Sequence, residues 1–133
     1  MTQEEKQLLL KDLCARIPNH VKVELHGEIC TCLGYFDDFV MLTSNTPLGQ
    51  QTNVANVKPY LRPMSSMTEE EKIELCTIAY APDEMKTIEE KLYVIKINAK
   101  NAADFYNEHH FDYRGLIPMG LALEAQEGMY KQN

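Results

Sequence analysis

The stretch VKVELHGEICTCLGYFDDFVMLT, residues 21–43, decides the expected fold. Its first five residues alternate between apolar and polar, which is typical of a strand with one buried face. EICTCLGYF and FVMLT are rich in β-branched and aromatic residues, and the short polar segments HGE and Asp37-Asp38 separate the three runs. The stretch therefore predicts three short antiparallel strands joined by tight turns.

A helix is expected before these strands. Thr2 and Glu5 have capping-box spacing, and apolar residues then recur at helical intervals until Pro18 interrupts them. This pattern predicts a helix over residues 3–16. A small sheet needs a cover for its apolar face, and this helix can provide it.

The sequence after residue 43 mixes loops, strands and helices. Residues 44–53 are polar and read as a loop, and NVANVKPYLRP, residues 53–63, as a last strand of the sheet. SSMTEEEKIELCTIAY predicts a helix, because Thr68 and Glu71 repeat the capping-box spacing and three glutamates fall in its first turn. One side of that helix is expected to carry Ile73, Cys76, Thr77 and Tyr80.

The last third contains four shorter candidates. Residues 91–98 are a strand candidate, and residues 101–110 a short helix anchored by Phe105. Residues 113–120 are expected to form an irregular helical turn that Asp112 caps and Gly120 ends. LALEA, residues 121–125, is a candidate final strand.

We therefore expect an α+β fold, in which an N-terminal helix packs on a small antiparallel sheet and a helical second lobe follows. The sheet can take the form of an SH3-like half-barrel or a partly closed barrel. We place the helix and sheet in residues 1–66 and the mainly helical lobe in residues 67–133, sharing one core in one compact unit.

Composition narrows the class of protein. The chain has 133 residues, of which 44% are hydrophobic and 25% charged, as in an ordinary globular domain. The N-terminus lacks the basic and long apolar regions of a signal peptide, and no apolar run approaches the length of a membrane span. We expect a cytoplasmic protein without membrane contact.

The net charge of −7 is uneven along the chain. Residues 1–66 carry 6 Lys/Arg against 7 Asp/Glu, whereas residues 67–133 carry 7 against 13. Neutralising phosphates requires clustered cations, and the sequence has no basic cluster, so direct nucleic-acid binding is disfavoured. The acidity suits a basic partner, or it simply keeps the protein soluble. We expect a protein partner or self-association.

The four cysteines allow two kinds of chemistry. His26, Cys30 and Cys32, with Cys14 or Cys76 as a fourth ligand, have the residue types of a zinc site, but one C-x-C pair lacks the usual zinc spacing. A thiol nucleophile needs a lowered pKa and partial exposure. We prefer small, buried, unreactive residues, and we expect no metal and no cofactor.

The stretch HHFDYR, residues 109–114, concentrates polar residues of catalytic type. A His near an Asp is the arrangement of an oriented general base, and Arg114 is able to hold an anion. The preferred interpretation is structural: a helix end at the two histidines, a cap at Asp112 and an ion pair at Arg114. We retain His110, Asp112, Tyr113 and Arg114 as a candidate interaction site and assign no catalytic residue.

Four motifs carry a resemblance to a known group of proteins. They are LLLKDLCARIP (8–18), VKPYLRPMSSMTEEE (57–71), HHFDYRGLI (109–117) and GLALEAQEGMY (120–130). In this order, and over nearly the whole chain, the sequence resembles small uncharacterised proteins of phages and prophages from gut anaerobic bacteria. The resemblance implies a phage-associated protein in a bacterial cytoplasm and transfers no activity. Pro118-Met119 stands where the resemblance implies a more polar pair.

The leading functional hypothesis is a non-enzymatic binding or adaptor module, because no phosphate loop, nucleophile elbow or metalloprotease motif occurs. The alternative is a small enzyme or a metal- or thiol-dependent factor that uses residues 109–114. A third hypothesis is a nucleic-acid-associated accessory protein.

Overall fold

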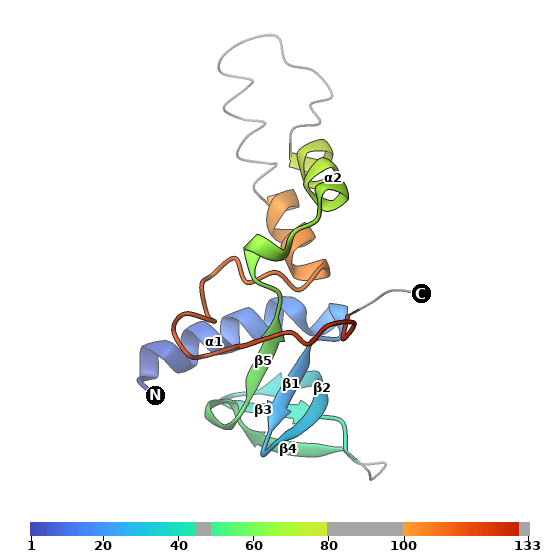
Figure 1. Ribbon diagram of the computed structural model, residues 1–133. Helices are drawn as coiled ribbons and strands as arrows, with labels where there is room; N and C mark the ends of the chain where they lie inside the picture. The colour runs from blue at the N-terminus through green and yellow to red at the C-terminus, as the bar shows by residue number, and fades with distance from the viewer. Residues whose placement is uncertain (45–48, 80–99, 131–133) are drawn as a thin grey trace.

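A computed structural model describes residues 1–44, 49–79 and 100–130 (Figure 1). It has an α+β fold with these elements in chain order: α1 (Gln3–Arg16), the 3₁₀ turn η1 (Ile17–Asn19), β1 (Lys22–Leu25), β2 (Glu28–Phe36), β3 (Phe39–Leu42), β4 (Gln50–Asn53), η2 (Val54–Asn56), β5 (Lys58–Leu61), η3 (Met64–Ser66), α2 (Glu69–Ala79) and β6 (Leu123–Glu124). Residues 100–108 are also helical. The strand expected at residues 91–98 and the position of Tyr80 lie outside the described residues.

Helix α1 confirms the first prediction, residues 3–16. Its capping box is complete: Glu5 N donates to the Thr2 hydroxyl at 3.1 Å, and Thr2 N donates to the Glu5 carboxylate at 3.0 Å. Leu9 and Leu13 are fully buried against the sheet. In Figure 1, α1 lies between the strands and the helical residues 69–79 and 100–108.

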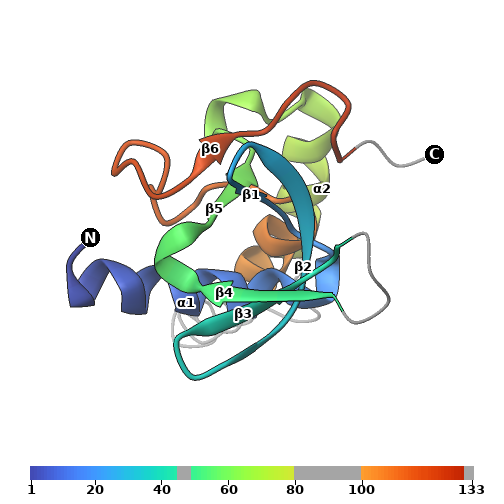
Figure 2. The same cartoon turned by 90° about the horizontal axis from the view of Figure 1, so that it is seen from below.

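The six strands form one open sheet in the order β4-β3-β2-β1-β5-β6. All pairings are antiparallel except that of β5 with β6, which is parallel. A bulge between Cys32 and Gly34 lets the long strand β2 bend, so that its first half pairs with β1 and its second half with β3 (Figure 2). The expected barrel is therefore not closed, because β4 and β6 lie at opposite edges.

Two expectations for the middle of the chain were wrong in detail. The polar segment 44–53, expected to be a loop, contains strand β4. This edge strand pairs with β3 through its backbone from Gln50 to Asn53, and its side chains show no apolar alternation. The single strand expected over residues 53–63 is instead the turn η2 followed by β5, with the Asn53 side chain capping the turn.

Residues 113–120 form turns rather than the expected helical turn. Gly120 nevertheless ends the segment as predicted. Its φ is +77°, its N–H donates to Ile117 O, and Leu121 N donates to Leu116 O. The chain then enters β6, which confirms the strand predicted in LALEA.

One hydrophobic cluster joins the two halves of the sequence. Leu116 and Leu121 pack in the same core as Leu9, Val23 and Leu42. Helix α2 has the predicted capping box, but Ile73, Cys76 and Thr77 on its expected apolar side are exposed. No helix among the described residues has the length and apolar character needed to cross a membrane.

Candidate functional site

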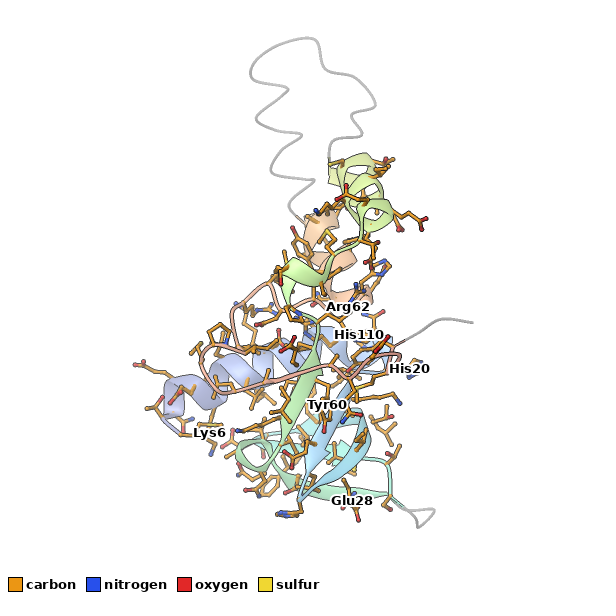
Figure 3. The ribbon with its side chains drawn as sticks, in the orientation of Figure 1. Lys6, His20, Glu28, Tyr60, Arg62 and His110 are labelled. Carbon is orange, nitrogen blue, oxygen red and sulfur yellow. The ribbon has the colours of Figure 1, made fainter. Side chains whose placement is uncertain are left out.

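The HHFDYR stretch lies beside the end of strand β5 and is held there by its backbone. Arg62 N donates to His110 O at 2.7 Å, and Asp112 N donates to Arg62 O at 2.8 Å. Phe111 between them forms a parallel bridge with Arg62 and is fully buried. Figure 3 shows Arg62 and His110 close together near α1. The main chain of this stretch is thus an extension of the sheet.

A buried ionic cluster joins the stretch to α1. The Asp12 carboxylate accepts from Arg16 at 2.8 and 3.1 Å and from Arg114 at 2.7 Å. Asp12 and Arg16 are completely buried, and Arg16 also donates to the Phe111 carbonyl at 2.6 Å. Charges taken out of water need such partners, because an unpaired buried charge is strongly destabilising. The ion pair predicted for Arg114 is therefore present, and its acceptor comes from the N-terminal helix.

Asp112 has the capping role expected of it. Its Oδ1 accepts from Leu116 N at 2.8 Å and its Oδ2 accepts from Ile117 N at 2.9 Å. Each carboxylate oxygen thus satisfies one backbone donor of the turns that follow. Asp112 is buried, with 7% of the residue exposed, and both of its carboxylate oxygens accept hydrogen bonds inside the fold.

His110 is buried and stacked on the ring of Tyr130. The ring centroids are 3.6 Å apart with an interplanar angle of 14°. Burial, followed by the positive charge of Arg16, lowers the pKa of His110 to about 3, so the ring is neutral at neutral pH. The residue has a left-handed backbone, with φ +63°. The two histidines do follow a helix end at residue 108, as predicted, but His110 does not carry the positive charge that such a position favours.

The aromatic residues of the stretch support neighbouring guanidinium groups. Arg62 lies over the ring of Phe111 at 4.2 Å, and Arg114 over that of Tyr113 at 4.6 Å. Arg62 also makes a bidentate pair with Glu71, both distances being 2.7 Å. That pair, helped by the Thr68 cap, lowers the pKa of Glu71 to about 2.

The structure directs the side chains of His110, Asp112 and Arg114 to different partners and does not combine them into a catalytic set. Among residues 1–44, 49–79 and 100–130, no hydrogen bond or ion pair joins His110, Asp112 and Arg114 to one another. General base catalysis needs an acceptor within hydrogen-bond reach of a substrate proton. The Asp112 oxygens already accept backbone N–H groups, and Arg114 is paired with Asp12.

The cysteines show no activated thiol. Cys30 and Cys32 are buried, which confirms the preferred interpretation for that pair, and Cys14 is half-buried. Burial raises the pKa of all three thiols, and that of Cys32 to about 11, which opposes thiolate formation. Cys76 is exposed, so its expected core position is wrong. Within the described part of the chain, no three His, Cys, Asp or Glu side chains are grouped to hold a metal ion.

Two features of the structure were not predicted from the sequence. One is Tyr130, the residue on which His110 stacks. The Tyr130 hydroxyl accepts from Lys22 N at 2.8 Å and donates to Tyr60 O at 2.7 Å. Lys22 and Tyr130 lie 108 positions apart, so no local pattern connects them. The other is the outer face of the β2–β3 hairpin, whose apolar residues could have been found by continuing the alternation of β2 past its buried cysteines.

Comparisons of the chain with protein-family models, with curated proteins and with solved structures find no match.

Proposed function

We propose that the protein is a non-enzymatic binding or adaptor module that contacts a protein partner through the outer face of the β2–β3 hairpin. The observation that carries the proposal is the grouping of exposed apolar side chains. Of the nine large hydrophobic residues exposed in the described chain, five belong to this hairpin: Ile29, Leu33, Tyr35, Phe36 and Phe39. Contiguous exposed apolar surface of this kind marks interaction sites on proteins.

The register of the hairpin puts four of these five residues on one face. Cys30 and Cys32 point into the core, so Ile29 lies on the opposite, outer face. The bulge sets both Leu33 and Gly34 opposite the outward residue Met41.

Beyond the bulge, Phe36 and Phe39 pair directly across the two strands, and they are 69% and 40% exposed. Such a pair places both side chains on the same face of the sheet. We define the outer hairpin face as Ile29, Leu33, Phe36 and Phe39. Tyr35 faces the other way, because it pairs with the buried Val40.

Charge at the hairpin indicates the chemistry of the partner. Asp37 and Asp38 form the turn between Phe36 and Phe39, and Glu28 begins β2. A partner with an apolar patch bordered by Lys or Arg side chains complements this surface. The chain as a whole has a net charge of −7, which disfavours a nucleic-acid partner.

The geometry of residues 109–114 supports a binding module over the alternative of a small enzyme. Asp112 and Arg114 have hydrogen-bond partners inside the protein, so neither is available to join His110 in a catalytic set. The phage or prophage setting is also part of the proposal, and its support is the sequence resemblance described above.

The test compares two surfaces of the same protein in a retention assay. Wild-type protein, a Phe36→Ser/Phe39→Ser variant and a Met119→Ser variant are immobilised and exposed to lysate of gut anaerobic bacteria, and size-exclusion chromatography records self-association. Met119 is 47% exposed and lies outside the hairpin, so it is the matched control. Circular dichroism establishes that all three are folded.

We expect one partner to be retained by the wild type and by Met119→Ser and lost from the hairpin variant. If the wild type is instead a dimer and the hairpin substitutions dissociate it, the partner is a second copy of the chain, and the proposal of a different protein as partner is wrong. Identical retention by all three proteins, or no retention and a monomer throughout, contradicts the proposal.

A further inference from the structure

A cavity of about 530 Å³ lies at the C-terminal end of α1, away from the outer hairpin face. Its walls come from four parts of the chain: the turn η1, strand β1, the end of the helical residues 100–108, and the C-terminal segment. The lining includes Asn19, His20, Lys22, Glu108, His110 and Tyr130. Figure 3 shows His20 and His110 at this end of the molecule. The volume is that of a small-molecule site.

The His110 ring is held rigidly in the cavity wall. Tyr130 covers one face of the ring, and its own hydroxyl is fixed by Lys22 N and Tyr60 O. The His110 carbonyl accepts from Arg62 N at 2.7 Å, which fixes the backbone. A group held in this way presents a hydrogen bond to a ligand without having to be ordered first.

The two nitrogens of the ring have different surroundings. Nδ1 is buried and has no hydrogen-bond partner. A buried N–H without an acceptor is rarer in proteins than a buried acceptor without a donor, so the proton of the neutral ring belongs on Nε2. Nε2–H is then the donor that the ring can offer to a molecule in the cavity.

Among the charged groups that lower the pKa of His110, Lys22 is the one that also lines the cavity. Arg16 and Arg62 act on the ring as well, but each is paired with a carboxylate, that of Asp12 and that of Glu71. His20 lines the cavity too, and Glu108 is the one acidic residue among the described lining residues. The Lys22 ammonium has no hydrogen bond or ion pair with a described residue, so beside the neutral His110 ring it favours an anionic group, whereas Glu108 opposes one.

We propose that this cavity binds a small anion through a carboxylate or phosphate group, with His110 Nε2–H donating to an anionic oxygen and Lys22 supplying the opposite charge. The site is separate from the outer hairpin face, and it stands or falls independently of the proposed adaptor function. Either ligand class presents the same acceptor chemistry to His110 and Lys22.

The test follows the ring resonances of His110 and Tyr130 by NMR near neutral pH. Three titrations are made on the full chain into the tens of millimolar: sodium phosphate, sodium acetate, and sodium chloride at matched ionic strength. Saturable shifts with phosphate, acetate or both, absent with chloride, are expected. Response to phosphate alone assigns a phosphate ligand, and response to acetate alone assigns a carboxylate.

Variants separate specific binding from general charge effects. Lys22→Gln is expected to weaken binding about tenfold, the effect of losing one charge-assisted hydrogen bond. Lys58→Gln is the matched control, because Lys58 is an exposed cation on the neighbouring strand β5 and does not line the cavity. Its affinity is expected to equal that of the wild type. Glu108→Gln is expected to bind more tightly.

Two results overturn the proposal. The first is the absence of a saturable shift at His110 and Tyr130 with both phosphate and acetate. The second is an equal loss of affinity in Lys22→Gln and Lys58→Gln, which would assign the shifts to the general field of the protein.

Discussion

Asp12 and Arg114 lie 102 positions apart in the chain, and their side chains form an ion pair of 2.7 Å. The same carboxylate holds Arg16, which donates to the carbonyl of Phe111. The Asp12 carboxylate of α1 therefore holds the HHFDYR stretch in two ways, directly through Arg114 and indirectly through Arg16. This arrangement gives the polar residues of that stretch a structural role: they join the N-terminal helix, the end of β5 and the C-terminal segment.

The first prediction concerns the cap at Asp112. An Asp112→Asn variant keeps one acceptor oxygen and replaces the other with an NH₂ donor facing a backbone N–H. We expect the free energy of unfolding to fall by about 1–3 kcal/mol, because a buried donor loses its acceptor. Urea denaturation measures the change. Asp104→Asn is the control, since Asp104 is exposed, and it should leave the midpoint nearly unchanged. Equal midpoints for the two variants would refute a capping role.

The second prediction concerns the Arg62–Glu71 pair. The folded protein holds the pKa of Glu71 at about 2, below the ordinary value of 4.5. The pair therefore contributes stability above pH 4.5, and this contribution is lost as the pH falls from 4.5 towards 2. Glu71→Gln should lower the free energy of unfolding by about 1–2 kcal/mol at pH 7.

The same variant should differ less from the wild type at pH 2.5–3, where the carboxylate of the wild type begins to protonate. Denaturation at both pH values measures this. Glu69→Gln is matched to it, because Glu69 is in the same helical turn but its pair with Lys72 is exposed. A loss in Glu71→Gln that is the same at both pH values would contradict the assignment.

The third prediction concerns His110 and pH. Its pKa is about 3 in the folded protein against an ordinary 6.5, so the unfolded chain binds an extra proton between these values. Stability should therefore decrease as the pH falls from 6.5, with a slope on the order of 1 kcal/mol per pH unit. His110→Asn should flatten the dependence between pH 6.5 and 4.5, a window above that of Glu71. Urea denaturation across this window measures the slope.

His26→Asn is the control for this experiment. His26 also has a left-handed backbone, with φ +51°, but it is exposed in the β1–β2 turn. Asparagine tolerates this conformation at both positions. The control should keep the wild-type slope, and a His110→Asn slope that matches it would show that His110 is not the titrating group.

The sequence was a good guide wherever a local pattern decides the structure. The Thr2 and Thr68 capping boxes, the alternation over residues 21–25 and the Gly120 stop each depend on residues within a few positions of one another, and the structure has all of them. Strand β4 was missed because its pairing with β3 is carried by the backbone of a polar edge strand.

The candidate site was harder to predict, because its partners are distant in the sequence. The sequence predicted that Asp112 caps a turn and that Arg114 pairs with a carboxylate, but it could not name Asp12 as that carboxylate. The burial of His110 depends on Tyr130, which the chain brings back from its C-terminal segment. Long-range packing thus decided the protonation of His110, whereas local pattern alone suggested a cation at a helix end.

The structural role of the HHFDYR stretch is tested most directly by a double-mutant cycle between Asp12 and Arg114. The free energy of unfolding is measured for the wild type, Asp12→Asn, Arg114→Gln and the double variant. The same cycle on Lys6 and Asp38, a longer, partly exposed pair 3.9 Å apart, is the reference and should give a coupling energy below about 0.5 kcal/mol. We predict a coupling energy of about 2 kcal/mol or more for Asp12 and Arg114. Single losses that simply add, with a coupling no larger than that of the reference pair, would contradict it.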